Sequence, residues 1–321
     1  MVSLLREGTF RFSEVRFSFL AAPILFFASS DFILRHYTKI LAAFLIGIYA
    51  YILYALLYGI YFYLVNDTIV FELNYYLKYV LYNYLPGAIH HTYVGMYLVF
   101  GSIIILFGTK LNTPKKIILV SPLLLAVAFI GSKFSVLIVF LTFLVWACIS
   151  LYKRHKKSLF ALVFLLVGLF YFGFSKSDLF RTLSNSFDQR IEIFRCSYEG
   201  IKENWLLGIG KEQVKPLIND CTSNSLEMDT HNMYLQELLS FGIIAFTLMM
   251  AVLLLLYLKS NKNLLLGLFL STFMLFGLVE HLFNMQLGVT YFVFFALVLF
   301  LKAREEKRFE QNDDTQLKAN I

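Results

Sequence analysis

Long apolar stretches separated by short polar turns dominate the chain. A transmembrane helix needs about 20 mainly apolar residues, and the sequence offers about nine candidates, with an error of about one or two because some are short. The pattern predicts an all-α fold, a polytopic transmembrane helix bundle. The stretches are 15–34, 40–65, 87–107, 117–131, 134–152, 158–174, 233–257, 264–283 and 287–301.

The segment 175–232 is the long polar interruption of this pattern. Polar segments of such length usually carry function or are disordered, and this one is patterned. Arg190 and Arg195 fall on either side of an apolar stripe, so we expect an amphipathic helix that lies on the membrane surface and ends at 208–210. The stripe consists of Phe187, Ile191, Phe194, Tyr198, Ile201 and Trp205, at spacings of three and four residues.

Composition places the chain in lipid. It is 59% hydrophobic and 15% charged, more apolar than a soluble domain of this length needs to be. The net charge of +7 would suit nucleic acid, but the basic residues cluster beside apolar stretches, at 153–157, 259–262 and 302–308. This is the positive-inside pattern, so we expect the lipid bilayer, and no nucleic acid, as a partner.

The basic runs also set the orientation. They place the turns and tail that contain them in the cytoplasm, and the 175–232 loop and the turn around 280–288 outside. Arginines at positions 6, 11 and 16 interrupt the first residues, so no cleavable signal peptide is expected. We divide the chain into N-terminal transmembrane helices 1–174, an extracytoplasmic loop 175–232, C-terminal transmembrane helices 233–301 and a cytoplasmic polar tail 302–321.

The segment 229–236 restarts a helix where the chain re-enters the membrane. Asp229 or Thr230 is a competent N-cap, which would place His231 and Asn232 in the first turn. An anionic group such as a diphosphate is favoured at that positive end of the helix dipole. Asn232, Gln236 and Ser240 would form a polar stripe along the helix. The alternative is a polar helix entrance at headgroup level that binds nothing.

Cations gather on the predicted outer side. Lys133 lies there against the positive-inside bias, with Arg190, Arg195 and His231, and with His91 as a possible neighbour. Several cations without an Asp-rich motif predict an anionic ligand at the membrane and no bound metal or other cofactor. For a residue at a helix end, snorkelling to water is the alternative. Other polar residues in costly positions at or within apolar stretches are Glu237, Glu280, His281 and Gln286.

Two of the three cysteines, Cys196 and Cys221, share the outer loop, while Cys148 lies in an apolar stretch. The loop would lie in an oxidising compartment, so we expect a Cys196–Cys221 disulfide that stabilises it by roughly 2–4 kcal/mol. Two unpaired thiols are the alternative. The cysteines show no metal-binding spacing.

A set of short motifs follows in order between about 85 and 300. The main ones are Arg190-xxx-Phe194, Glu-Asn-Trp-Leu-Leu-Gly-Ile-Gly at 203–210, Thr-His-Asn-Met-Tyr-Leu at 230–235 and Gly-Ile-Ile at 242–244. Together they resemble the O-antigen ligase and polymerase superfamily, whose hallmark is a long periplasmic loop that ends in a His-Asn-x-Tyr-Leu helix start. Weaker matches are His-Thr-Tyr at 91–93, Ser-Lys at 132–133 and a Glu-x-x-x-x-x-Gln-x-Gly turn at 280–288.

The resemblance implies transfer of a glycan from undecaprenyl diphosphate to a sugar hydroxyl, with inversion and without metal, at the periplasmic face of a bacterial inner membrane. The donor would be an undecaprenyl-diphosphate-linked glycan, and the acceptor a glycan or the lipid A core. Arg190 and Lys133 would hold the diphosphate, and His231 would be the base or a positioning group for the acceptor. The remaining substrate-binding candidates are Arg195, Asn232, Gln236, His91 and Glu280.

Two departures from the superfamily pattern stand out. Lys133 stands where arginine is usual, which gives up bidentate binding of phosphate. Relatives have more N-terminal spans, so we expect an N-terminal portion to be missing from this sequence, or the span count to be off by one.

Other functions remain open at this level. Within the enzyme class, a ligase and a polymerase share these motifs and differ in the acceptor. A transporter of lipid-linked glycans would be expected to show internal repeats and helices broken near the midplane, whereas the polar residues here gather toward one face. A scaffold without activity would leave the outer cations unexplained.

Overall fold

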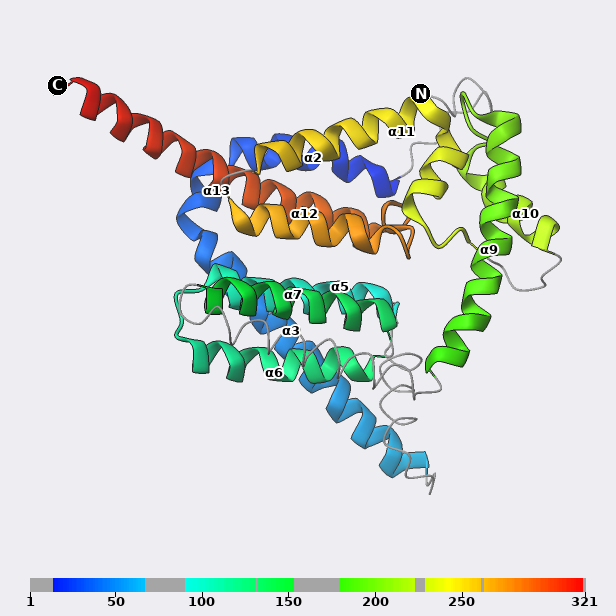
Figure 1. Cartoon of the computed structure of the whole chain (residues 1–321), viewed down its shortest axis with the longest axis horizontal. Helices are drawn as coiled ribbons and strands as arrows, with labels where there is room; N and C mark the ends of the chain where they lie inside the picture. Colours follow the sequence, from blue (N-terminus) through cyan, green and yellow to red (C-terminus); the bar gives the residue numbers. More distant parts are fainter. Residues whose placement is uncertain are drawn as a thin grey trace. The chain divides into compact units, whose positions relative to one another are not determined.

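The structure, a computed structural model, describes residues 14–66, 90–130, 132–152, 179–222, 229–260 and 263–319. All regular elements in these ranges are helices, which confirms the all-α class (Figure 1). They are α2 (Glu14–Ala28), α3 (Ser30–Asn66), α5 (His91–Ile103), the π-helix η1 (Ile104–Gly108), α6 (Thr113–Phe129), α7 (Lys133–Tyr152), α9 (Leu179–Asn204), α10 (Lys211–Thr222), α11 (Met233–Lys259), α12 (Leu264–Phe276), the 3-10 helix η2 (Leu282–Asn284) and α13 (Gln286–Ala319).

Among the described residues, five helical segments are long and apolar enough to cross a membrane. Four of them coincide with expected stretches, and Ser30–Tyr58 overlaps both 15–34 and 40–65, which were expected as separate spans. The stretch 158–174 lies outside the described residues. The helices α2, α6 and α12 are shorter, at 15, 17 and 13 residues. The chain is therefore a membrane protein, and the count of about nine spans stays a prediction. The five segments are Ser30–Tyr58, His91–Gly108, Lys133–Ser150, Met233–Lys259 and Gln286–Phe309.

One expected stretch, 264–283, is not a continuous helix. The helix α12 ends at Phe276, and the chain runs through Gly277–Asn284 with only the short η2 turn. The backbone carbonyls at the break bond elsewhere: Gly277 O accepts from Met233 N at 2.7 Å, and Leu278 O accepts from Asn232 Nδ2 at 3.1 Å. Hydropathy alone could not reveal this break, because the residues on both sides of it are apolar.

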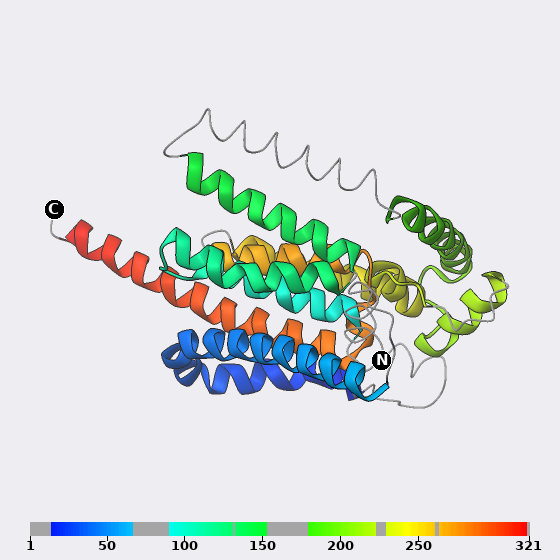
Figure 2. The same ribbon diagram turned by 90° about the horizontal axis from the view of Figure 1, so that it is seen from below.

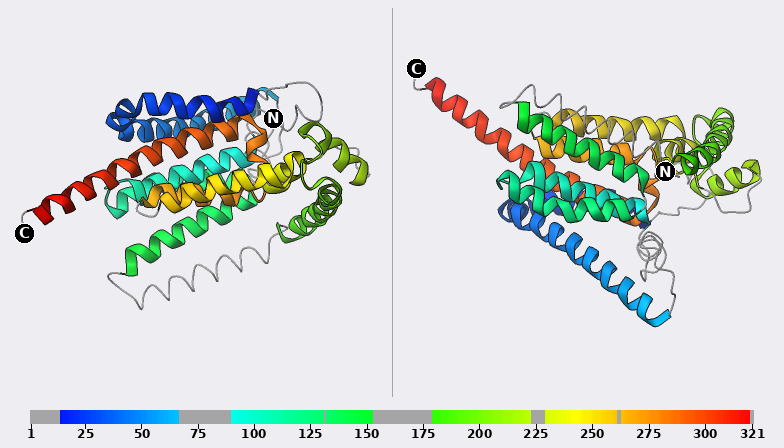
Figure 3. Two further views of the ribbon diagram at one scale, coloured as in Figure 1. Left: turned by 90° about the horizontal axis from the view of Figure 1, so that it is seen from above. Right: turned by 60° about the horizontal axis from the view of Figure 1, so that its bottom comes forward.

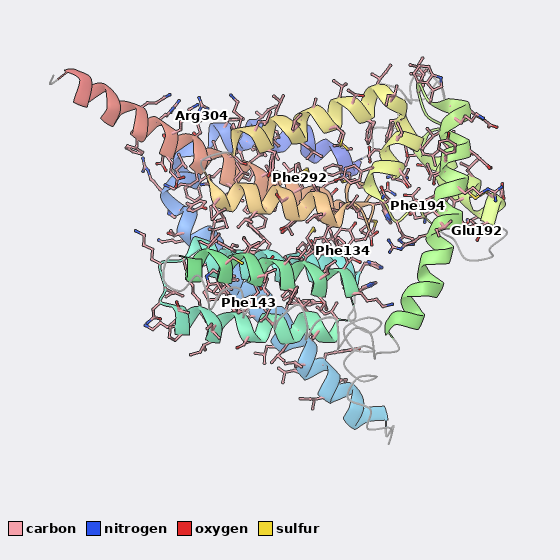
Figure 4. The ribbon with its side chains drawn as sticks, viewed as in Figure 1. Phe134, Phe143, Glu192, Phe194, Phe292 and Arg304 are labelled. Carbon is pink, nitrogen blue, oxygen red and sulfur yellow. A yellow bond between two sulfur atoms is a disulfide. The ribbon has the colours of Figure 1, made fainter. Side chains whose placement is uncertain are left out.

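The chain divides into two compact units, which we describe separately. One unit comprises Glu14–Thr142, Leu254–Phe276 and Met285–Ile321. In it α13 packs along α2 and α3 (Figure 2), and α5 packs against α6 and α12 (Figure 3). Aromatic side chains fill this interior: the Phe100 ring lies 4.9 Å from those of both Phe269 and Phe295. Figure 4 labels two further rings of this unit, Phe134 and Phe292.

The other unit comprises Met1–Ser13, Phe143–Leu253 and Gly277–Asn284, and its described part contains α9, α10, most of α11 and η2. The helices α9 and α10 lie against each other (Figure 1) and are joined by the Cys196–Cys221 disulfide, with the Cα atoms 5.9 Å apart. A small core links these helices with the start of α11 and buries Cys196, whereas Cys221 is exposed. The core consists of Ile193, Cys196, Ile209, Val214, Ile218 and Leu239.

Candidate active site

The loop after α9 holds the beginning of α11 by backbone contacts. Ile209 N donates to Leu239 O at 2.8 Å, and Ile243 N donates to Trp205 O at 2.8 Å. Helix α11 is interrupted between these bonds at Gly242, which has φ 72°. A Cβ there would lie 2.2 Å from Leu206 O, so this backbone crossing requires glycine. We call the paired segments 205–210 and 239–243 the clasp.

The start of α11 differs from the expectation. Its cap is Asn232, whose Oδ1 accepts from Tyr234 N at 2.9 Å and Leu235 N at 3.0 Å. The expected N-caps, Asp229 and Thr230, lie before this cap, and so His231 and Asn232 are not in the first helical turn. The backbone at His231 has φ 45°, which is uncommon for a residue other than glycine. Such strain persists where the surroundings impose it, as they often do at functional sites.

The side-chain amides near this cap bond to the protein itself. Asn232 Nδ2 donates to Leu278 O, which ties the cap to the 277–284 segment. Gln236 is 2% exposed; its Oε1 accepts from Thr230 Oγ1 at 2.9 Å, and its Nε2 donates to Ser240 Oγ at 3.3 Å. These contacts give Asn232 and Gln236 a supporting role beneath His231.

A buried carboxylate, Glu280, lies at the centre of the candidate site. Its side chain is 3% exposed, and its Oε1 lies 2.9 Å from His281 Nδ1 and 4.0 Å from His231 Nδ1. The backbone N–H of His281 donates to the same oxygen at 3.2 Å. A carboxylate is stable at such depth only when cations and donors surround it. Glu280 is therefore held inside the protein, while His231, at 38% side-chain exposure, can still be reached from outside.

A second carboxylate, Asp229, lies on the far side of His281. Its Oδ2 is 3.6 Å from His281 Nε2 and 3.9 Å from Lys215 Nζ, and its side chain is 11% exposed. Both are ion-pair distances, longer than a good hydrogen bond. The charged groups therefore alternate in the order Lys215, Asp229, His281, Glu280, and His231 follows Glu280. We call these five residues the relay cluster.

Arg190, on α9, is a cation of the same neighbourhood. Burial lowers the pKa of its guanidinium, and the charge of Glu280 raises it. Arginine is effectively always protonated in proteins. Arg190 therefore brings a fixed positive charge close to Glu280 and His231.

The two histidines of the cluster titrate in opposite directions. Burial lowers the pKa of His231; the charge of Glu280 raises it, those of His281 and Arg190 lower it, and the net pKa is below the ordinary 6.5. Burial also lowers the pKa of His281, but the hydrogen bond and charge of Glu280, with the charge of Asp229, raise it above 6.5 overall. His231 is therefore biased toward the neutral form, which can accept a proton, and His281 toward the charged form.

Among the described residues, one group of side chains could be considered for a metal ion: His231, Glu280 and His281, whose ligand atoms all lie within 4.8 Å of one another. A metal there would have to replace a proton of His281, whose pKa Glu280 raises, and it would be repelled by Arg190. We therefore treat the group as charged side chains at ion-pair distances.

The other expected site residues lie elsewhere. Arg195 is 81% exposed and pairs with Glu199 at 3.6 Å. Lys133 and His91 begin α7 and α5 in the other unit, where Ser132 Oγ and Ser135 Oγ are 2.6 Å apart beside the start of α7. The structure thus gathers His231, Glu280 and Arg190 in one unit.

Sequence reasoning had not assigned site roles to Asp229, Lys215 and His281. Asp229 was available from the motif, because it stands two positions before His231. His281 was visible as a polar residue beside Glu280, but its partners were not. Lys215 carries no local signal, because it is an ordinary basic residue of a polar helix.

The outer face of α9 carries exposed apolar residues. Ile191, Phe194 and Tyr198 are 51%, 40% and 67% exposed, and Trp205 just beyond the helix is 57% exposed. Figure 4 labels Phe194 and Glu192 on this helix. The opposite face, with Ile193 and Cys196, is buried in the core. The stripe expected from the sequence is thus largely solvent-exposed, except that Ile201 packs partly on the core; the placement of the Phe187 side chain lies outside what the structure describes.

In a comparison with known families, residues 117–250 match the family described as O-antigen ligase. No curated protein matches the chain. The matched range includes Arg190 and His231, the disulfide and the clasp, whereas Glu280 and His281 lie beyond it.

Proposed function

We propose that the chain, whose residues 117–250 match the O-antigen ligase family, is a metal-independent, inverting glycosyltransferase of the bacterial inner membrane. The donor is an undecaprenyl-diphosphate-linked glycan, and the acceptor is a sugar hydroxyl on a growing surface polysaccharide or on the lipid A core. The active site faces the periplasm. One observation carries the proposal: the buried Glu280 lies close to both His231 and the cationic Arg190.

Each group has one role in the transfer. The acceptor hydroxyl gives its proton to His231 as its oxygen forms a bond to the anomeric carbon. The bond from that carbon to the diphosphate oxygen breaks, and the diphosphate leaves with the electron pair. Arg190 binds the leaving diphosphate, whose negative charge grows as the bond breaks. Inversion follows because the acceptor attacks from the side opposite the diphosphate.

Glu280 fits the role of an orienting partner for the base. It faces His231 Nδ1, at 4.0 Å, which leaves Nε2 for the acceptor hydroxyl. The distance exceeds a hydrogen bond, and catalytic contacts of this kind often tighten only when substrate is bound. A negative charge beside the imidazole stabilises the imidazolium that forms during transfer, as the carboxylate does in a Ser-His-Asp triad.

Lys133, His91 and Arg195 remain candidate contacts for the donor. A lysine supplies a point charge to a phosphate without the planar fork of arginine. Arg195, exposed on α9, suits a more distant part of the donor or the headgroup phosphates of the bilayer.

The proposal is tested by the surface glycan of a deletion strain, separated on a gel after complementation. We expect wild-type chain to restore the long-chain ladder and His231→Ala to abolish it, because loss of a general base costs about 10²–10⁴-fold in rate. His36→Ala is the matched control, since His36 bonds only within its own helix, to Phe32 O at 2.9 Å. A full ladder with His231→Ala, at equal amounts of protein in the membrane, would refute the assignment.

A matched pair of arginines on α9 tests the diphosphate role. Arg190→Lys keeps the charge and loses the bidentate geometry, so we expect a reduced ladder, and Arg190→Ala should remove it. Arg195→Ala, on the exposed side of the same helix, should leave more activity than Arg190→Ala. Equal loss at both positions would point to a general need for positive charge on α9.

The same gel distinguishes the ligase from the alternative polymerase. Bare lipid A core with accumulated lipid-linked chains in the deletion strain indicates a ligase, and lipopolysaccharide with a single repeat indicates a polymerase. A transporter makes no new glycosidic bond, so purified protein that joins a lipid-linked glycan to an added acceptor would exclude that class.

A further inference from the structure

The side of Glu280 that faces away from His231 is occupied by His281. Both ring nitrogens of His281 face carboxylates: Nδ1 lies 2.9 Å from Glu280 Oε1, and Nε2 lies 3.6 Å from Asp229 Oδ2. The side chain is 12% exposed, and the ring centroid lies 6.0 Å from that of His231. His281 therefore lies behind the base, close to it but on the protein side.

We propose that His281 is a positioning residue of the transfer reaction, which holds the carboxylate of Glu280 toward His231 through the contact of its Nδ1 with Glu280 Oε1. This inference rests on the proposed function. His281 does not touch the acceptor in this scheme, and it orients His231 through Glu280.

The geometry explains why Glu280 needs such a partner. Its oxygen Oε1 is shared by the backbone N–H of His281, the Nδ1 of His281 and, at longer range, His231. Arg190 competes for the same carboxylate from α9, since the two charges act on one another. Without the Nδ1 contact, Glu280 is free to turn toward Arg190, and His231 then loses the charge that orients and stabilises its protonated form.

His281 is itself held in place. The chain turns through η2 directly after it, where Asn284 N donates to His281 O at 2.9 Å. Asp229 fixes the other edge of the ring, and Lys215 balances the charge of Asp229. The bond from Met233 N to Gly277 O keeps the whole 277–284 segment at the start of α11.

Two isosteric substitutions separate the contacts of the ring. His281→Asn keeps an amide near the position of Nδ1, so the contact with Glu280 survives. His281→Gln places its amide near the position of Nε2, so only the contact with Asp229 survives. We expect His281→Asn to keep kcat within about tenfold of wild type and His281→Gln to lower it about 10²-fold, with little change in the KM of the donor in either variant.

The pH profile supplies a readout that a merely structural role would not move. Positive charge on His281 lowers the pKa of His231, and asparagine carries no charge. The acid limb of kcat/KM should therefore move to higher pH in His281→Asn. Glu280→Gln removes a charge that raises the same pKa, so its acid limb should move to lower pH. Opposite shifts from the two neighbours are the expected signature.

The assay uses the full-length chain, purified in lipid nanodiscs, with donor extracted from the deletion strain. Formation of the Cys196–Cys221 disulfide on a non-reducing gel verifies the fold of each variant. Wild-type activity in both His281 variants overturns the inference, and so does equal loss in both without a shift of the acid limb. If neither His281 variant accumulates, the pH profile of Glu280→Gln is measured instead. An acid limb of kcat/KM at the wild-type pH in Glu280→Gln overturns the inference.

Failure of the inference is distinguishable from failure of the proposed function. If the function is wrong, wild-type chain transfers no glycan, or His231→Ala transfers it as well as wild type does. If only the inference is wrong, wild type is active and His231→Ala is not, while the two His281 variants fail to differ.

Discussion

Loss of the Cys196–Cys221 disulfide should lower the free energy that is needed to separate α10 from α9. The size of this effect depends on the length of the loop that the disulfide closes. The bond joins residues 25 positions apart. In the chain-entropy description of cross-links, closing a loop of that size removes about 12 cal/mol/K from the unfolded state, or about 3.5 kcal/mol at 25 °C. A free energy of about 3.5 kcal/mol corresponds to about a 400-fold change in an opening equilibrium.

Hydrogen exchange of the solubilised protein measures this opening directly. The hydrogen-exchange protection factors of the α10 amides should fall about 400-fold when the chain carries Cys196→Ala and Cys221→Ala. The same fall is expected when the wild-type disulfide is reduced. Amides of α13 belong to the other unit and should not change. Cys148→Ala is the matched control, because Cys148 is the free cysteine of the chain.

The alanine variants change more than the cross-link. Cys196 is 2% exposed in the core of α9, α10 and α11, so alanine there also removes some packing. Reduction of the wild-type bond leaves the side chains in place and isolates the cross-link. Less than a tenfold loss of α10 protection on reduction would mean that the core alone holds α10, and the loop-closure reasoning would be refuted.

Three further outcomes follow from the described geometry. The acid limb of kcat/KM should lie below pH 6.5, because burial lowers the pKa of His231. His231 then stays neutral until the pH falls through that lowered value. An acid limb at or above pH 6.5 in a pH–rate profile would contradict this. Gly242→Ala should cost about 1–3 kcal/mol, measured by thermal unfolding, because φ is 72° there; Gly47→Ala, which meets nothing within 4 Å, should not destabilise the protein. Trp146→Phe removes one of the two tryptophans and leaves Trp205. If α9 lies at the membrane surface, lipids brominated near the headgroup should quench the fluorescence of Trp205 most strongly. Quenching by a water-soluble quencher and not by brominated lipid would place α9 in water.

Local patterns were enough to predict the helical class, and they pointed to several residues of the candidate site. Apolar stretches of sufficient length predict spans directly, because a bilayer demands internal hydrogen bonding of the backbone. The motif at 230–235 drew attention to His231, and the position of Arg190 beside an apolar stripe pointed to a phosphate contact. Both are signals that a few neighbouring residues carry by themselves.

The partner of His231, the proposed base, was not predictable in the same way. Glu280 stands 49 positions after His231, and the two meet because the chain leaves helix at Gly277, whose carbonyl accepts from Met233 N. Hydropathy counts side chains and does not report where a backbone carbonyl finds its donor. The N-cap prediction for α11 was wrong for a related reason. Asp229, Thr230 and Asn232 are all good N-cap residues, and the turn at His231 leaves Asn232 in the capping position.

The charge balance of the relay cluster is compatible with the two proposed tasks of the site, which are to bind a diphosphate and to accept a proton. With His281 protonated, Lys215, His281 and Arg190 carry three positive charges and Asp229 and Glu280 two negative ones, a sum of +1 around a neutral His231. That surplus would attract the proposed anionic donor, while burial, together with the charges of His281 and Arg190, lowers the pKa of His231. In the proposed reaction Glu280 is the nearest counter-charge to the imidazolium that forms on His231, and the leaving diphosphate gains negative charge at the same moment. On that proposal the carboxylate must face His231 during the step itself, and a neighbour that fixes its direction would contribute to the rate without touching the substrate.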